Sequence, residues 1–227
     1  DRVFPLLRDH QVQCVQGNYD NSIGNDLQDC QCGYTDPRDN WFAQLSYNYT
    51  YANTSIVNRE WMRALPSEIR FEVDGLRFLL CHGSPRKTNE FLWESTTSTH
   101  FLNRLVNDAE ADIVLGTHSG IHWQRRLNSD RLFVNVGVLG RPENDGTTNV
   151  WYAIADTARA GEDRARPAPD SGSVRVEFVP LSYDHERLAG EMQAENLPDE
   201  FVKTILEGWW TTCLEVLPGK ERRRGQY

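Results

Sequence analysis

IRFEVDGLRFLLCHGSP, residues 69–85, is the stretch that decides the fold. The Asp74-Gly75 pair in its middle is a strong hairpin signal, because Asp and Gly both accept the left-handed backbone angles of a two-residue turn. The apolar and aromatic residues on either side predict two antiparallel strands. The second strand, residues 76–81, ends directly at His82, so the segment predicts a histidine at the end of a strand.

Two further short strands are followed at once by glycine and polar side chains. They are VQGNYD, residues 15–20, and VLGTHSGIH, residues 114–122. In open α/β sheets, functional sites gather beyond the carboxyl ends of strands, where loops converge on a rigid frame. We therefore expect Asn18, His82 and His118 to meet in a metal site. An ordinary turn after the first of these strands, together with structural histidines, is the alternative.

Elsewhere the chain alternates helices and strands at first and shows hairpin-like strands later. This order indicates an α/β fold with a layered, mixed sheet. Residues 24–56 are polar and rich in turn formers, and they predict a long excursion on the surface. Residues 157–172, rich in Pro, Ala and Arg, predict a mobile segment. Further helices are predicted at 3–7, at 56–65 after a Ser55 cap, at 95–111 and at 185–208 with a break at Leu197-Pro198, and further strands at 12–16, 112–116, 131–140, 149–156 and 173–181.

The composition is that of an ordinary globular chain, with 39% hydrophobic and 25% charged residues among 227. This length allows one sizeable core, or one core with an appendage. The formal net charge of −9 argues against stable binding to nucleic acid or to an anionic membrane surface. It would also repel an anionic substrate unless a local site, most simply a metal, reverses the field. No apolar run approaches the ~20 residues of a membrane span and no signal peptide is evident, which predicts a cytoplasmic protein.

The five cysteines are an odd number and do not indicate a disulfide framework. Only Cys30 and Cys32 are close in sequence, and the single residue between them is too short a spacing for an ordinary zinc knuckle. We interpret them as loop cysteines, in preference to a metal or redox site.

Four motifs together carry a resemblance to a known family. GNYD, CHGSPRKTNEFL, GTHSGIHWQRR and FVNVGVLGRPENDG resemble, in order and spacing, the later motifs of the calcineurin-like metallophosphoesterases of the small bacterial and archaeal branch. The resemblance runs through residues 14–146 and implies a sandwich of two mixed β-sheets flanked by helices. We expect residues 1–182 to form this domain and residues 183–227 to form a helical extension that packs on it.

The resemblance also implies a cofactor and a reaction. Two divalent metal ions, Mn, Fe, Zn or Mg, would be held at the strand ends, and Asn18, His82 and His118 would bind the second of them. Asp20 resembles the carboxylate that orients a neighbouring group. Paired cations of this kind bridge a phosphate and a hydroxide and promote hydrolysis of phosphate monoesters or phosphodiesters. The expected substrate is a phosphorylated small molecule or nucleotide.

The chain departs from the family pattern in several places. The Asp-x-His and Gly-Asp motifs that supply the first metal are not present, and we expect a preceding βαβ unit to be missing, with impaired activity. Tyr19 stands where the family often has a histidine that protonates the leaving group, and a phenol is a poorer acid. Gly120 falls where a second metal-binding histidine belongs. His122 is close enough to replace it, although an outward-facing histidine fits equally well.

Other residues of these motifs are candidates for binding substrate. Arg86, Lys87 and Arg141 would bind phosphate, unless they are simply solvated. Asn135, in a glycine-containing loop, would help the backbone to approach the site. In the C-terminal tail, Trp209-Trp210 is costly to expose, and we expect it to cover the core of the protein rather than to dock a partner.

Two functions of different classes follow from these observations. The first is a metal-dependent phosphoesterase. The second is a degenerate relative that keeps the fold as a phosphate-binding, nucleotide-binding or interaction module, which the residues Tyr19, Gly120 and Val138 would favour. The oligomeric state is not predicted.

Overall fold

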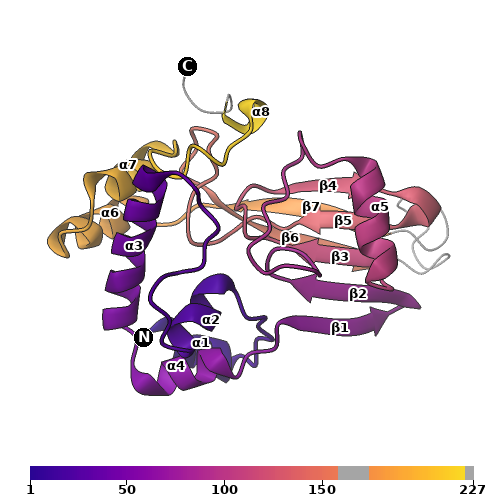
Figure 1. The fold of residues 1–227 in the computed structure, drawn as a ribbon, viewed down its shortest axis with the longest axis horizontal. Helices are drawn as coiled ribbons and strands as arrows, with labels where there is room; N and C mark the ends of the chain where they lie inside the picture. The colour runs from indigo at the N-terminus through magenta and orange to yellow at the C-terminus, as the bar shows by residue number, and fades with distance from the viewer. Residues whose placement is uncertain (158–173, 223–227) are drawn as a thin grey trace.

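The computed structural model describes residues 1–157 and 174–222 of the chain. A five-stranded sheet with the order β1-β2-β3-β5-β4 forms the centre, and a two-stranded antiparallel sheet, β6-β7, lies against it (Figure 1). The strands are β1 Glu68–Val73, β2 Leu76–Cys81, β3 Ile113–Gly116, β4 Trp123–Arg126, β5 Leu132–Asn135, β6 Val150–Thr157 and β7 Val174–Leu181. The helices are α1 Val3–Asp9, α2 Asn18–Gly24, α3 Pro37–Ala52, α4 Ile56–Arg63, α5 Thr99–Asp108, α6 His185–Ala194, α7 Asp199–Glu207 and α8 Gly219–Arg222, with a 3₁₀ turn η1 at Asn128–Asp130.

The hairpin at residues 69–85 is confirmed. Strands β1 and β2 pair antiparallel, and the rings of Phe71 and Phe78, which are opposite each other in the register, stack with centroids 4.9 Å apart. Asp74 and Gly75 both have positive φ, 52° and 79°, which suits a two-residue hairpin turn.

The centre of the five-stranded sheet is parallel, and this places the functional strand ends together. Strand β3 pairs parallel with β2 on one side and with β5 on the other. Their carboxyl ends, at Cys81, Gly116 and Asn135, therefore lie at one edge of the sheet. Strand β4, residues 123–126, was missed by the sequence analysis. It pairs antiparallel with β5 and is only four residues long, which is too short for a clear alternating pattern.

Two apolar layers cover the faces of this sheet. On one face, α5 packs its buried leucine and valine side chains against Leu79, Val114 and Phe133. On the other face, side chains of β2, β3 and β5 pack against Val174 and Val176 of β7. Each fully buried side chain of this size contributes about 1.5–3 kcal/mol. These layers produce the predicted sandwich of two sheets. The smaller sheet, β6-β7, is antiparallel, whereas a mixed sheet was predicted.

The N-terminal part corrects two predictions. Residues 12–16 do not form a strand, and the backbone N–H of Gln16 donates to the carbonyl of Pro66, 2.7 Å away. Residues 24–56 are not a continuous surface loop but contain the 16-residue helix α3. The Asp36 carboxylate caps this helix by accepting from the backbone N–H of Asp39, and Pro37 suits its first position.

The interpretation of the paired cysteines is also corrected. Cys30 and Cys32 lie in a loop, as expected, but they are joined by a disulfide with Cα atoms 5.2 Å apart, within the range that a disulfide spans. Both are buried in a cluster with Ile23, Tyr47 and Met62, contributed by α2, α3 and α4. This cluster holds the N-terminal helices together beside the edge of the sheet (Figure 1).

The C-terminal part forms two helices, α6 and α7, as predicted, and they lie beside α3 (Figure 1). Trp210 in the following tail is buried with Trp93, Ile121 and Leu217, and its indole N–H donates to the carbonyl of Pro142 at 2.8 Å. The tail therefore covers the core at Trp210, as expected. The segment predicted to be mobile falls almost wholly within residues 158–173, outside the described residues. Within the described part of the chain, no helix has the length and apolarity needed to cross a membrane.

Candidate metal centre at the strand ends

The backbone brings three segments together at the carboxyl edge of the parallel strands. His82 follows β2, and its carbonyl accepts from the N–H of Thr117, 2.7 Å away, which extends the β2–β3 pairing by one step. A side chain at Gly116 would place its Cβ 2.9 Å from the Gly83 carbonyl, so this close approach requires glycine. His118 lies one residue beyond Thr117 with a φ of 56°.

Asn18 reaches the same place from α2. It is the first residue of this helix, after Gly17, whose N–H donates to the Asp20 carboxylate at 2.8 Å. The Asn18 amide NH₂ donates to the carbonyl of Cys30 at 2.9 Å, and its Oδ1 lies 2.8 Å from His82 Nε2. The helix cap and the Cys30 carbonyl therefore fix the amide with its oxygen toward the histidine.

Asn18 Oδ1, His82 Nε2 and His118 Nδ1 converge, and we call these three residues the strand-end cluster. His118 Nδ1 lies 3.0 Å from His82 Nε2. A hydrogen on His82 Nε2 has two acceptors to serve, the amide oxygen and an unprotonated His118 Nδ1, and would have to be shared between them. If Nε2 instead accepts from His118, it faces the amide oxygen lone pair to lone pair.

Burial keeps both imidazoles neutral. Desolvation lowers the pKa of His82 to about 4. Desolvation also lowers the pKa of His118 to about 3, where the nearby His82 and Lys87 act in the same direction and a backbone contact with Cys32 acts against them. At neutral pH the cluster therefore presents ring nitrogens that are uncharged and able to bind a cation.

The cluster fits a divalent cation. Donor atoms 2.8 and 3.0 Å apart match neighbouring ligands about 2.1 Å from one ion. Two imidazoles and an amide oxygen suit Mn, Fe or Zn better than Ca. Within residues 1–157 and 174–222, no group of three or more His, Cys, Asp or Glu side chains could hold a metal, so the amide of Asn18 is needed to complete the set.

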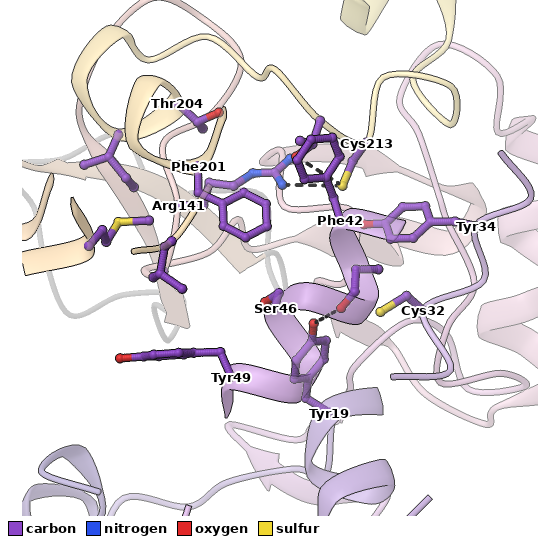
Figure 2. A pocket seen from close by; sticks show the side chains of 16 residues that line it. Tyr19, Cys32, Tyr34, Phe42, Ser46, Tyr49, Arg141, Phe201, Thr204 and Cys213 are labelled. Atoms are coloured by element: carbon purple, nitrogen blue, oxygen red, sulfur yellow. Dashed lines mark hydrogen bonds between the residues drawn. The ribbon is translucent and has the colours of Figure 1, made fainter. Parts of the chain in front are cut away.

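The two predicted catalytic residues beside Asn18 form hydrogen bonds outside the cluster. The Asp20 carboxylate caps α2 at Gly17, which makes it a positioning group. The Tyr19 hydroxyl donates to the carbonyl of Ala43 in α3 at 3.3 Å (Figure 2), and burial raises its pKa. Both features of Tyr19 disfavour the predicted proton donation.

His122 lies in a separate site. Its Nδ1 is 2.6 Å from Oε1 of Glu143, and its backbone N–H donates to the same oxygen. Its ring packs between those of Trp151 and Phe178, with centroids 4.3 and 4.4 Å away. None of the contacts of the described residues joins His122 to the strand-end cluster. Gly120, at the position of the expected second histidine, has a φ of 76°, which disfavours any side chain there.

The predicted substrate-binding residues are dispersed. Asn135 is 1% exposed and braces the loop that carries His118. Its side-chain NH₂ donates to the carbonyl of Thr117 and to the Ser119 hydroxyl at 2.8 and 2.7 Å. Arg86 pairs with Glu90 and lies over a phenyl ring away from the cluster. Lys87 is exposed and lies near enough to His118 to lower its pKa. Arg141 lies over the indole ring of the tail, 3.4 Å from its centroid.

The sequence analysis missed three contacts of the predicted site residues. Cys32 lies 3.3 Å from the Asn18 amide nitrogen, Phe91 packs on His118 with ring centroids 4.5 Å apart, and Glu143 binds His122. Glu143 falls inside the quoted motif GRPENDG, but an acidic residue among turn formers gives no signal that it is 1% exposed.

Comparisons with known proteins agree with this fold. A model described as the calcineurin-like phosphoesterase superfamily domain matches residues 2–160. A hypothetical protein from Pyrococcus horikoshii OT3 is similar in structure, with a TM-score of 0.68 and 16% identity over 92% of this chain and 79% of that chain. A metallophosphoesterase from Sphaerobacter thermophilus is also similar, with a TM-score of 0.57 and 19% identity over 86% of this chain and 76% of that chain. No curated protein gives a significant match.

Proposed function

The chain belongs to the calcineurin-like phosphoesterase superfamily, and from this premise we propose that it hydrolyses phosphate monoesters or phosphodiesters with divalent metal ions. Membership supports metal-dependent phosphoester hydrolysis in general, and two metals are the number we propose. The observation that carries the proposal is the convergence of Asn18 Oδ1, His82 Nε2 and His118 Nδ1. These three atoms would hold one of the cations.

Bound cations would supply the polarisation of the phosphate and the acidification of a water molecule. The chain's own residues prepare the place for them. The partly buried imidazoles remain neutral, and the Cys30 carbonyl holds the Asn18 amide in one orientation. Asp20 fixes the start of α2, which carries Asn18.

Lys87 would provide the first contact with the substrate. It is exposed, and its ammonium group is the positive charge that acts on His118. On a chain with a net charge of −9, a local cation at the cluster attracts a phosphate that the remaining surface repels. The substrate we propose is a phosphorylated small molecule or nucleotide.

A non-catalytic phosphate-binding or nucleotide-binding module is the second candidate. The three donors of the cluster are neutral, so they bring no negative charge to balance a divalent cation. A site of this kind binds metal more weakly than one with carboxylates, which favours binding over turnover.

Substitution of His82 by alanine tests the two candidates. We expect the wild-type chain to hydrolyse p-nitrophenyl phosphate or bis(p-nitrophenyl) phosphate when Mn²⁺ or Zn²⁺ is added. His82→Ala should lower kcat/KM by more than about a hundredfold, because a ligand is lost. His100→Ala, which changes an exposed histidine at the start of α5, is the matched control. Equal turnover in His82→Ala and wild type would refute the strand-end cluster as the metal site of the reaction, whereas nucleotide binding without any metal-stimulated turnover would favour the module.

A further inference from the structure

A cavity of about 380 Å³ lies between α3, α6–α7 and the segment at Arg141 (Figure 2). Its volume is that of a site for a drug-sized or nucleoside-sized molecule. We call it the extension pocket. Its wall is largely aromatic and apolar, with Tyr19, Tyr34, Phe42, Tyr49, Met192 and Phe201 among its side chains.

Among the residues that the structure describes, Arg141 is the one charged side chain in the wall of the extension pocket. Its guanidinium lies 3.4 Å from the centroid of the Trp210 ring, and Nη1 lies 3.8 Å from Cys213 Sγ. None of the ion pairs of the described residues includes Arg141. A cation that is stacked on an indole and faces an apolar wall without a carboxylate partner favours an anionic group on the ligand.

The extension pocket adjoins the strand-end cluster on two sides. Cys32 lines the pocket, and its Sγ lies 3.3 Å from the Asn18 amide nitrogen. Tyr34 also lines the pocket, and its ring packs on Phe91 with centroids 5.7 Å apart. Phe91 in turn packs on His118. A molecule in the pocket is therefore one side chain, Cys32, away from Asn18 and two side chains, Tyr34 and Phe91, away from His118.

Much of the wall lies outside residues 2–160, the part of the chain that the family model matches. Met192, Phe201 and Cys213 belong to the C-terminal helices and tail. The buried carboxylate of Asp39 fixes this tail to α3, since its two oxygens accept from the backbone N–H groups of Cys213 and Glu215 at 2.7 and 3.2 Å. The extension thus adds a wall that the matched domain does not supply.

We propose that the extension pocket binds the organic group of the substrate, that this group is aromatic, and that Arg141 contacts an anionic oxygen of the same molecule. This proposal rests on the proposed function, because it takes the bound molecule to be the substrate of the enzyme. It assigns the choice of substrate to the C-terminal extension. Phe42 of α3 and Phe201 of α7, whose ring centroids lie 5.7 Å apart, would pack on the aromatic ring of the ligand.

The test compares an aromatic ester with an aliphatic one. We would measure kcat/KM for 1-naphthyl phosphate and for ethyl phosphate in wild type and in two variants that fill the pocket from opposite walls, Ser46→Phe on α3 and Met192→Phe on α6. Arg141→Met removes the charge. Arg38→Met is the matched control, because Arg38 also lies over an aromatic ring, Phe42, but does not line the pocket. Thermal unfolding would verify that each variant is folded.

We expect the ratio of the two kcat/KM values, aromatic over aliphatic, to fall at least about tenfold in Ser46→Phe, Met192→Phe and Arg141→Met and to stay within about twofold in Arg38→Met. An unchanged ratio in folded variants of both walls would overturn the proposal.

A second measurement separates this proposal from the proposed function. If wild type hydrolyses neither ester, binding of 1-naphthyl phosphate to chelator-treated protein is measured by calorimetry. Binding that is lost in Ser46→Phe and Arg141→Met but kept in Arg38→Met would support the pocket as an aromatic-anion site even though the enzyme hypothesis had failed. Absence of binding to wild type would overturn the pocket as well.

Discussion

His118 and His122 are four residues apart in sequence, yet the fold gives them opposite surroundings. His118 faces His82 and, through it, the amide oxygen of Asn18. His122 faces the buried carboxylate of Glu143 and is enclosed by two aromatic rings. The first site brings three lone-pair-bearing atoms together around at most one shared hydrogen, whereas in the second a carboxylate oxygen accepts from two N–H groups.

The difference between these surroundings distinguishes a candidate metal ligand from a structural histidine. In the His122 site, one carboxylate oxygen of Glu143 accepts from both the ring Nδ1 and the backbone N–H of His122. These two groups of His122 therefore find their partner within the protein. In the strand-end cluster, at best one hydrogen on His82 Nε2 is shared between the amide oxygen of Asn18 and Nδ1 of His118. An added cation would relieve the strand-end cluster and has no evident role at His122.

The largest expected effect is on metal affinity. His118→Asn should weaken binding of Mn²⁺ or Zn²⁺ by more than about a hundredfold, because a ring nitrogen ligand is lost. His122→Asn should leave the affinity within about threefold of wild type. Calorimetric titration of chelator-treated protein gives both values. Similar losses in the two variants would show that His122 is also a ligand and would abolish the contrast between the sites.

A smaller effect is expected on stability at the other site. Glu143→Ala removes a buried acceptor of two hydrogen bonds from His122, and we expect the free energy of unfolding to fall by about 2–4 kcal/mol. Glu94→Ala is the control, because Glu94 forms a partly exposed ion pair with Lys220 and should cost less than about 1 kcal/mol. Urea unfolding measures both. Equal costs would mean that the Glu143 contacts do not fix His122.

The smallest expected effect is a pH dependence of the metal-free protein. Burial lowers the pKa of His82 to about 4 and that of His118 to about 3, so the unfolded chain takes up protons near pH 6.5 before the folded chain does. Stability should therefore fall as the pH falls from about 6.5 toward about 4. Between pH 7 and 5.5 the loss is about 1 kcal/mol per histidine.

Unfolding in chelator across this range would test the pH prediction. His82→Asn should reduce the slope of stability against pH, since one of the two titrating imidazoles is removed. A slope that is the same in wild type and His82→Asn would contradict the assignment.

Short sequence patterns were sufficient to predict where strands β2 and β3 end. The Asp74-Gly75 turn and the apolar runs before His82 and Gly116 predicted the hairpin and two of the three strand ends. These features depend on the period of a strand and on turn geometry, which act over a few residues. Asn18 was expected after a third strand that does not form, and it reaches His82 from the start of α2 instead.

Long-range packing decided what the sequence analysis missed. Helix α3 has no clear apolar stripe, and it is held by Phe42 and Tyr47, which bury themselves against other segments. Burial of Glu143 depends equally on neighbours that are distant in sequence.

The sequence by itself determined the family, the α/β class and the three candidate ligands, because each follows from a motif within a few residues. Only the tertiary structure decided that His122 faces a carboxylate, that Asn135 braces the loop, and that α3 and the C-terminal extension enclose a pocket beside the cluster. The physical reason is that a side chain's partners and burial are set by elements that meet in space. The spacing of residues along one segment does not specify which elements those are.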